Sequence, residues 1–321
     1  MPPTGKLKSV FAVPNAPGTR YEGVILFNQI VAAIGFGIVT ASVIGIAVLG
    51  FDLTFAVSNV INLGFVAFML IGQFITYVAR DVPLHPWSSI LAGCLVAGVA
   101  SSLLHTGIIR PFQRRKAPGF TLVVITLAVY ALVSSVFSMI FGSSEYYFPV
   151  SLAETRGIHI GAFIVTQPQL GVIATAFAVV LVTDLVLRWT GIGRTVRAIA
   201  DDRELAISAG VRSSLVTTSI WFVSGALGGL AGVCLAYTQV NFSTTSAQPY
   251  FVFIVAAAFV GGAGEMYGAA IGALIIGISI ELLSLMIPPD LSPVVAFLIL
   301  IVVVLARPEG IAGKGRVRLA E

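Results

Sequence analysis

Long apolar segments with very few charged residues are the feature that most constrains this chain. The sequence is almost continuously apolar from Gly23 to Ala79, and Asp52, Asn59 and Asn62 interrupt the middle of that stretch. Its length allows two long or three short membrane crossings, because one crossing needs about 20 residues. Only 10% of the 321 residues are charged, whereas soluble domains carry about 25%. The sequence therefore predicts an all-α, polytopic transmembrane helical bundle.

Further apolar segments follow, separated by short polar loops. The predicted crossings are 88–109, 120–141, 170–187, 215–240, 269–287 and 291–306. The apolar run 249–260 is too short to cross a bilayer straight and leads into several glycines, which predicts a broken helix. Gly225, Gly228, Gly229 and Gly232 form two overlapping GxxxG spacings, which favour close helix packing. Altogether we expect about 8–10 spans. Asp184 and Arg188 are one helical turn apart and are expected to pair near the membrane interface.

Basic residues predict which loops face the cytoplasm. A cluster of four follows residue 109, and more cations follow Arg307, so both regions are placed inside by the positive-inside rule. The expected location is the cytoplasmic (inner) membrane of a prokaryote, with a cytoplasmic C-terminus. Counting crossings back puts the N-terminus outside, whereas Lys6, Lys8 and Arg20 favour the inside. We expect a polar extension at 1–22, a permease domain at 23–312 and a basic cytoplasmic tail at 313–321.

The longest charged interruption lies at 191–214 and begins GIGRTVRAIADDRELAISAGV. Its small and apolar residues, which are Ala198, Leu205, Ala206 and Ala209, have spacings that would share one side of a short helix. Gly210 then stands where a helix would stop, because glycine adopts the left-handed conformation without steric cost. This pattern predicts either a surface helix that contacts a soluble partner or a solvated loop whose arginines fix orientation.

Motifs for catalysis, nucleotides or metals are not found in this sequence. Gly313-Lys314 lacks the spacing of a phosphate loop, and the GxG at Gly191 lacks a third glycine. The three histidines are scattered and match no zinc pattern. Neither Cys94 nor Cys234 has a CxxC spacing. The net charge of +4 reports topology rather than nucleic-acid binding. We expect a transporter with membrane lipid around it, no metal and no cofactor bound by this chain.

Three segments resemble the permease subunits of branched-chain amino-acid ABC importers. Residues 193–201, with Ala206 and Gly210-Val211 after them, are similar to that family's GRxxRAxAxD signature. Residues 261–268 look like its GGxGxxxG, and residues 307–311 look like its closing P-x-G-I/L. The segment 50–64 also resembles the family's start, where Asn62 matches an asparagine that precedes an AHG triplet. This chain has Gly64, Phe65 and Val66 there instead, which leaves the role of that histidine open.

The resemblance covers residues 24–312 and is closer to the LivH type than to the longer LivM type. It implies that 191–214 contains a cytoplasmic coupling helix that docks in a groove of a separate ATPase subunit. The implied coupling residues are Arg194, Arg197, Ala198, Asp201, Asp202, Glu204, Ala206 and Gly210. It further implies ATP-Mg on that ATPase, a second homologous permease of LivM type, an extracytoplasmic substrate-binding protein, and alternating access.

The candidate substrate pathway consists of polar residues and of glycines at the expected helix break. These residues are Asn59, Asn62, Gly261, Gly262, Gly264, Glu265 and Gly268. A half-helix end can stabilise a zwitterionic amino acid through its dipole, but the glycines could equally serve helix packing alone. Glu265 and Glu281 either line the pathway or pair locally. The alternatives to branched-chain amino-acid import are an importer of urea or another small amide, and an ATP-independent channel or carrier.

Overall fold

A computed structural model describes residues 20–80, 86–148, 157–160, 163–239, 241–288, 291–307 and 310–311. The first half of the chain forms α1 (Arg20–Ser58), α2 (Phe65–Ala79), α3 (Pro86–Leu104), the π-helix η1 (His105–Ile109), α4 (Arg110–Arg114), α5 (Gly119–Phe141) and α6 (Gln167–Trp189). The second half forms α7 (Gly191–Asp201), α8 (Arg203–Ser208), α9 (Ser213–Gln239), α10 (Tyr250–Gly261), α11 (Met266–Ser284) and α12 (Ser292–Ala306). The predicted all-α class is confirmed.

The apolar helices agree with the predicted number of spans. Within the described ranges, six helices are long and apolar enough to cross a membrane, and α2, α10 and α12 are shorter apolar helices. The run 23–79 forms one long helix, α1, and the short α2. The chain turns between them at 59–64, where the Leu63 amide donates to Thr126 Oγ1 (3.1 Å) on α5.

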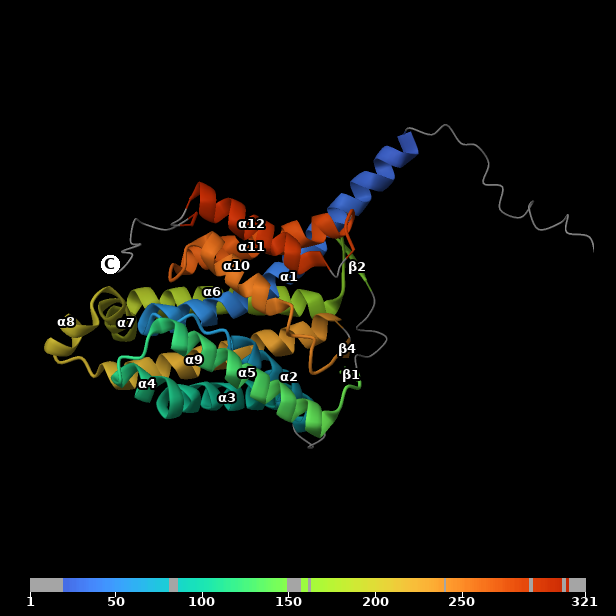
Figure 1. Cartoon of the computed structure of the whole chain (residues 1–321). Helices are drawn as coiled ribbons and strands as arrows, with labels where there is room; N and C mark the ends of the chain where they lie inside the picture. Colours follow the sequence, from blue (N-terminus) through green and yellow to red (C-terminus); the bar gives the residue numbers. More distant parts are fainter. Residues whose placement is uncertain are drawn as a thin grey trace, which may run out of the picture.

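The bundle has two chemically different ends (Figure 1). We call one the basic end: α4, α7 and α8 lie there, together with Arg110, Arg114, Arg115, Lys116, Arg194, Arg197 and Arg212. The other is the hairpin end, where α1 projects from the bundle with its first residues. The start of α1 and the C-terminal end of α12 therefore lie at opposite ends.

Short strands at the hairpin end were not predicted. β1 (Tyr146–Tyr147) pairs antiparallel with β4 (Asn241–Phe242), and β2 (Ile158–Ile160) pairs antiparallel with β3 (Phe163–Val165). Strands of two or three residues carry no alternating pattern that could be recognised in a sequence. An aromatic cluster packs beneath the β1–β4 pair, with Phe74 of α2 lying 5.3 Å from Phe242 between ring centroids.

Glycines on α9 let three helices pack closely, as the two GxxxG spacings predicted. Gly225 faces α3, where an added Cβ would lie 2.6 Å from the Ala97 carbonyl oxygen. Gly232 faces α2, where an added Cβ would lie 2.1 Å from the Met69 carbonyl oxygen. Within a lipid bilayer such close contact is a main source of helix association. The centre of the bundle is therefore built from α1, α2, α3 and α9.

Candidate coupling surface and solute pathway

The charged stretch is attached rigidly to the end of α6. The Thr190 hydroxyl accepts a hydrogen bond from the Gly193 amide (3.3 Å) and so caps α7. Gly193 packs against the backbone of Leu187, because an added Cβ there would lie 2.0 Å from the Leu187 carbonyl oxygen. Only glycine permits this sharp turn. Movement of α7 must therefore be accompanied by movement of the last turn of α6.

The stretch forms two helices, which corrects the prediction of a single short one. Asp202 has an extended backbone between α7 and α8, and its Oδ1 accepts the Leu205 amide (3.0 Å). Aspartate is a preferred residue at this capping position, because its side chain replaces the missing intrahelical acceptor. The pair of helices buries Val196, Ile199 and Ala206, which pack in one cluster with residues of α1 and α9.

The outer face of α7 and α8 is polar, with three large apolar side chains exposed among its described residues: Ile192 (61%), Leu205 and Ile207. Arg194, Arg197, Ala198, Asp201 and Asp202 are all exposed. Leu205 is 68% exposed and Ile207 51% exposed, although both lie on a polar stretch.

Ala206 lies on the opposite side of α8 from its neighbour Leu205. It is only 5% exposed, so the prediction that it shares one face with Ala198, Leu205 and Ala209 was wrong. The break at Asp202 rotates α8 relative to α7, which the helical spacing could not reveal. The Glu204 side chain lies outside the described residues.

Gly210 ends α8 as predicted. Its φ is +86°, and the following amide of Val211 donates to the Ala206 carbonyl (3.0 Å). This is the usual way in which a left-handed glycine closes a helix. Nothing lies within 4 Å of a Cβ added to Gly210, so the backbone conformation alone requires glycine there.

The predicted interruption is present between α10 and α11, but it is a turn that packs the two helices against each other and not a break within one helix. Gly262 (φ +107°) and Gly264 (φ +87°) turn the chain between the two helices. Gly261 contacts the first turn of α11, since an added Cβ would lie 2.1 Å from the Gly268 carbonyl oxygen. The C-terminal segment covers this turn, because the Ile311 amide donates to the Val260 carbonyl (2.9 Å). These glycines therefore serve the turn and close packing, and their role in a pathway stays a prediction.

A buried carboxylate on α1 lies next to this break. Asp52 is only 4% exposed, and the backbone amide of Gly264 and the carboxyl group of Glu265 lie near it. Neither of its oxygens forms a hydrogen bond with any residue that the structure describes. A carboxylate buried in this way inside a membrane helix is costly and usually functional. The sequence showed Asp52 as a polar interruption, but we did not predict it as a pathway residue.

The two asparagines of the predicted pathway have different roles. Asn59 is exposed, has φ +51° and ends α1 through its amide, which donates to the Phe55 carbonyl (2.8 Å). Asn62 is fully buried, and its side-chain amide has no hydrogen-bond partner among the described residues. Asn59 is thus explained by the turn, whereas Asn62 stays a candidate for contact with a solute.

Two polar side chains of α2 were missed as candidates. Gln73 and Thr76 are buried, and none of their side-chain nitrogen or oxygen atoms has a hydrogen-bond partner in the described part of the chain. The signal available in the sequence was a glutamine inside an apolar run. Gln73, like Asn62, has an uncharged amide side chain that could form hydrogen bonds with a polar solute.

Three residues connect the charged stretch to the helix break. The predicted pair between Asp184 and Arg188 is present, with 2.7 Å between Oδ1 and Nε. The Tyr267 hydroxyl of α11 donates to the same Asp184 oxygen, and the Arg188 guanidinium lies 4.6 Å above the Tyr267 ring. The last turns of α6, which carry α7, are thereby held against the first turn of α11.

Glu281 lies on α11 away from the break. Its Oε1 accepts a hydrogen bond from the Thr40 hydroxyl of α1 (2.8 Å). This hydrogen bond gives Glu281 a partner on another helix, and its place on the solute pathway stays a prediction.

Comparison with known protein families gives a match over most of the chain. Residues 33–304 match the model of the family described as "Branched-chain amino acid transport system / permease component". The chain is 25% identical over 300 residues to the "High-affinity branched-chain amino acid transport system permease protein LivH" of Salmonella typhimurium, covering 88% of this chain and 94% of that protein.

Two further relatives extend the range of organisms. The LivH protein of Escherichia coli K12, with the same full name, is 26% identical over 300 residues, which cover 88% of this chain and 94% of that protein. The "Probable branched-chain amino acid transport permease protein LivH" of Methanocaldococcus jannaschii is 27% identical over 297 residues, which cover 86% of this chain and 90% of that protein. No solved structure gives a significant match.

Proposed function

Because the chain belongs to the family of branched-chain amino acid transport system permease components, we propose that it is the membrane-spanning subunit of an importer driven by a separate ATPase. It moves branched-chain amino acids across the cytoplasmic membrane by alternating access. ATP-Mg is bound by the ATPase and not by this chain. The observation that carries this proposal is the surface formed by α7 and α8. Its inner side packs against α1 and α9, and its outer side is exposed.

The exposed face of α7 and α8 has the composition of a docking surface. Leu205 and Ile207 offer apolar area in a polar setting, and the arginines and aspartates around them can fix the register of a partner. Interfaces of this kind combine an apolar centre with a polar rim. The buried side of the two helices is already satisfied by α1 and α9. The outer side therefore serves a partner protein, which we identify with the ATPase.

The distribution of basic residues supports the orientation that this proposal needs. Most of the described cations gather at the basic end, whereas Arg20 and Arg80 lie at the hairpin end, where the Arg80 Nη1 donates to the Tyr147 carbonyl (2.9 Å). Short loops rich in lysine and arginine remain in the cytoplasm. We place the basic end, with the C-terminus, in the cytoplasm, and the start of α1 outside.

Two further partners follow from the same proposal. Alternating access in such importers needs a pore between two permeases, so we expect a second, LivM-type subunit beside this chain. An extracytoplasmic binding protein delivers the amino acid to the hairpin end. The outward faces of α5, α6 and α12 carry many exposed large apolar side chains, which suit lipid or the second permease.

The contacts around Tyr267 suggest how docking reaches the pathway. When the ATPase moves α7, the rigid turn at Gly193 moves the last turn of α6. The hydrogen bond from Tyr267 to Asp184 then transmits the displacement to the start of α11. This helix begins at the glycine turn beside Asp52, where polar groups lie at the cytoplasmic side of the bundle. A rearrangement of this turn would open or close the inner part of the pathway.

An uptake assay tests the proposed function. Uptake of labelled leucine and labelled urea is measured in cells with and without the gene, each with ATP intact and depleted. We expect ATP-dependent leucine uptake that is lost with the gene. Urea uptake alone would keep the importer architecture and change the substrate. Uptake that is indifferent to ATP would refute the importer and favour a channel or carrier.

A pair of variants tests the docking surface itself. Leu205→Asp removes exposed apolar area without touching the interior, so leucine uptake should fall while the amount of inserted protein is unchanged. Arg307→Glu changes an exposed residue at the same end but outside α7 and α8, and it should leave uptake near the wild-type level. Binding of the purified ATPase subunit to each variant gives a direct second measurement.

A further inference from the structure

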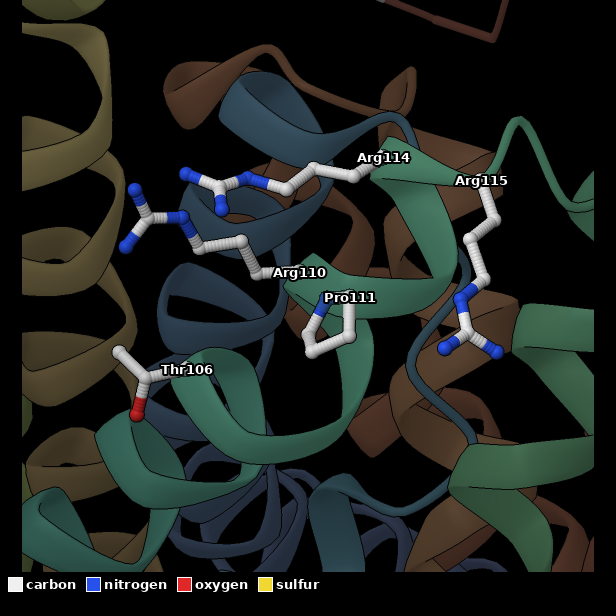
Figure 2. Close-up of a pocket in the computed structure, with 5 residues that line it drawn as sticks. All are labelled: Thr106, Arg110, Pro111, Arg114 and Arg115. Atoms are coloured by element: carbon white, nitrogen blue, oxygen red, sulfur yellow. The ribbon is translucent and has the colours of Figure 1, made fainter.

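A hollow lined by arginines lies at the basic end of the bundle, at α4 (Figure 2). One part has a volume of about 310 Å³ and is lined by Thr106, Arg110, Pro111, Arg114 and Arg115. A second part of about 280 Å³ shares two of these arginines and is lined by Arg110, Gln113, Arg114, Ser213 and Ser214. The two parts thus meet at Arg110 and Arg114, between α4 and the start of α9.

The backbone that carries these arginines is firmly held. The π-helix η1 precedes α4, and its first residue, His105, stacks on Trp221 of α9 with 5.2 Å between ring centroids. Gln113 Nε2 donates to the Ser58 carbonyl (3.3 Å) at the end of α1. A π-helical turn adds a residue to the turn and often occurs at functional sites. The arginines therefore project from a fixed base rather than from a loose loop.

Arg110 and Arg114 extend to the same side of α4, as their spacing of four residues requires (Figure 2). Arg115 extends to the other side of the helix end. None of the three forms an ion pair with an acidic side chain in the described ranges of the chain. Two like charges at this spacing repel each other, so their side-by-side position is unfavourable until an anion lies between or beside them.

The side chains around the hollow indicate which kind of molecule carries that anion. Leu103 (63% exposed), Ile108 (37%) and Phe112 (37%) lie on the same run of helices, and Phe120 (78%) lies at the start of α5. Exposed apolar side chains of this size face lipid chains when they lie on membrane helices. The arginines are at the end of these helices, which is the level of the headgroups. A soluble acidic partner would not need apolar side chains beside the cations.

We propose that this hollow binds the phosphate headgroup of an anionic phospholipid, with Arg110 and Arg114 contacting the phosphate. Guanidinium groups bind phosphate by paired, charge-assisted hydrogen bonds. Basic pockets between membrane helices on the cytoplasmic side are suited to such headgroups. The acyl chains would then lie along Leu103 and Ile108. The hollow is also lined by Ser213, three residues after Gly210, so the bound headgroup would lie close to the end of α8.

Lipid binding by the purified full-length chain tests this proposal. Native mass spectrometry is carried out with phosphatidylglycerol and with phosphatidylcholine, which share acyl chains and differ in headgroup charge. We expect the wild type to bind phosphatidylglycerol at least about tenfold more tightly, because the choline group of phosphatidylcholine brings a positive charge next to the arginines, whereas the glycerol group is neutral. The double variant Arg110→Gln/Arg114→Gln should lose this preference. Arg307→Gln removes a charge at the same end and should keep it.

Three other outcomes would overturn the proposal. An unchanged preference in the double variant would mean that the arginines do not bind the headgroup. Complete displacement of phosphatidylglycerol by millimolar inorganic phosphate would indicate a site for a free anion. Loss of ATPase binding in the double variant, with lipid preference intact, would assign the hollow to the partner protein. Arg110→Lys keeps the charge and should retain part of the preference, which separates loss of binding from misfolding.

Discussion

The α7–α8 stretch and the glycine turn between α10 and α11 both interrupt apolar sequence, but they are built on opposite principles. The first is rich in charge and exposed, and its amphipathic helices are held only on their inner side. The second is nearly uncharged and largely buried, and backbone packs directly on backbone there. A docking surface needs side chains directed outward, whereas a turn inside a bundle needs side chains to be absent. The two regions should therefore respond differently to the same kinds of substitution.

The largest expected effect concerns backbone packing at the glycine turn. Gly261→Ala places a Cβ 2.1 Å from the Gly268 carbonyl oxygen, and a backbone atom cannot move aside cheaply. Overpacking that separates two helices should destabilise the fold by about 3 kcal/mol, the upper end of the usual range. We expect most of this variant to be lost as aggregate when it is purified in detergent and analysed by size-exclusion chromatography.

The matched control for this prediction is Gly264→Ala, three residues further along. An added Cβ there meets only a Phe55 ring carbon at 3.8 Å, so the cost is the positive φ of +87°. That conformation costs alanine about 1–2 kcal/mol. Equal behaviour of the two variants would show that conformation, and not close packing, accounts for the glycines.

The second prediction compares two neighbours on α8. Ala206→Asp buries a carboxylate in the cluster with Val196 and Ile220 and should destabilise the protein by about 2–4 kcal/mol. Leu205→Asp changes an exposed residue and should leave the unfolding temperature close to that of the wild type. Thermal unfolding in detergent measures both. A larger loss for Leu205→Asp would show that α8 is oriented the other way.

These regions also differ in how far the sequence alone predicted them. The break between α10 and α11 was predicted because 12 residues are too few to cross a bilayer and glycines follow them. The amphipathic nature of 191–214 was predicted from its charges, but the inward direction of Ala206 was not. Helical spacing assumes one continuous helix, and the capping side chain of Asp202 starts a second.

Contacts between distant segments set the limit of prediction from a single sequence. The pair of Asp184 and Arg188 was predicted, since residues four apart on a helix are neighbours. Tyr267 lies 83 residues further along the chain from Asp184, and no local pattern indicates that these two meet. Asp52 is similar: its polarity was visible in the sequence, but its position beside Gly264 depends on how α1 packs against α10 and α11.

The third prediction concerns the connection between the two regions. Tyr267→Phe removes the hydrogen bond to Asp184 and leaves the ring beneath the Arg188 guanidinium. If this bond transmits movement from α7 to the glycine turn, leucine uptake should fall by about fivefold, equivalent to ~1 kcal/mol for one hydrogen bond. ATP hydrolysis by the assembled importer should fall less than uptake does.

Tyr147→Phe is the control for that measurement. It removes a hydroxyl at the hairpin end, where Tyr147 is exposed and its hydroxyl donates to Glu145 Oε2 (3.4 Å). Uptake by this variant should match the wild type. If the two tyrosine variants behave alike, the hydroxyl of Tyr267 does not couple α6 to α11.

The smallest expected effect is at Asn59, which resembles the glycine turn more than the docking surface. Its φ of +51° is a conformation that asparagine tolerates and glycine adopts freely, and its backbone closes α1. Asn59→Gly should therefore change stability by less than about 0.5 kcal/mol and leave leucine uptake unchanged. Asn59→Val should destabilise the protein by about 1–2 kcal/mol, because a β-branched residue is strained there. If Asn59→Gly reduced uptake at normal stability, the Asn59 side chain would take part in solute transport. The exposed turn at residue 59 would then have a function, as α7 and α8 do.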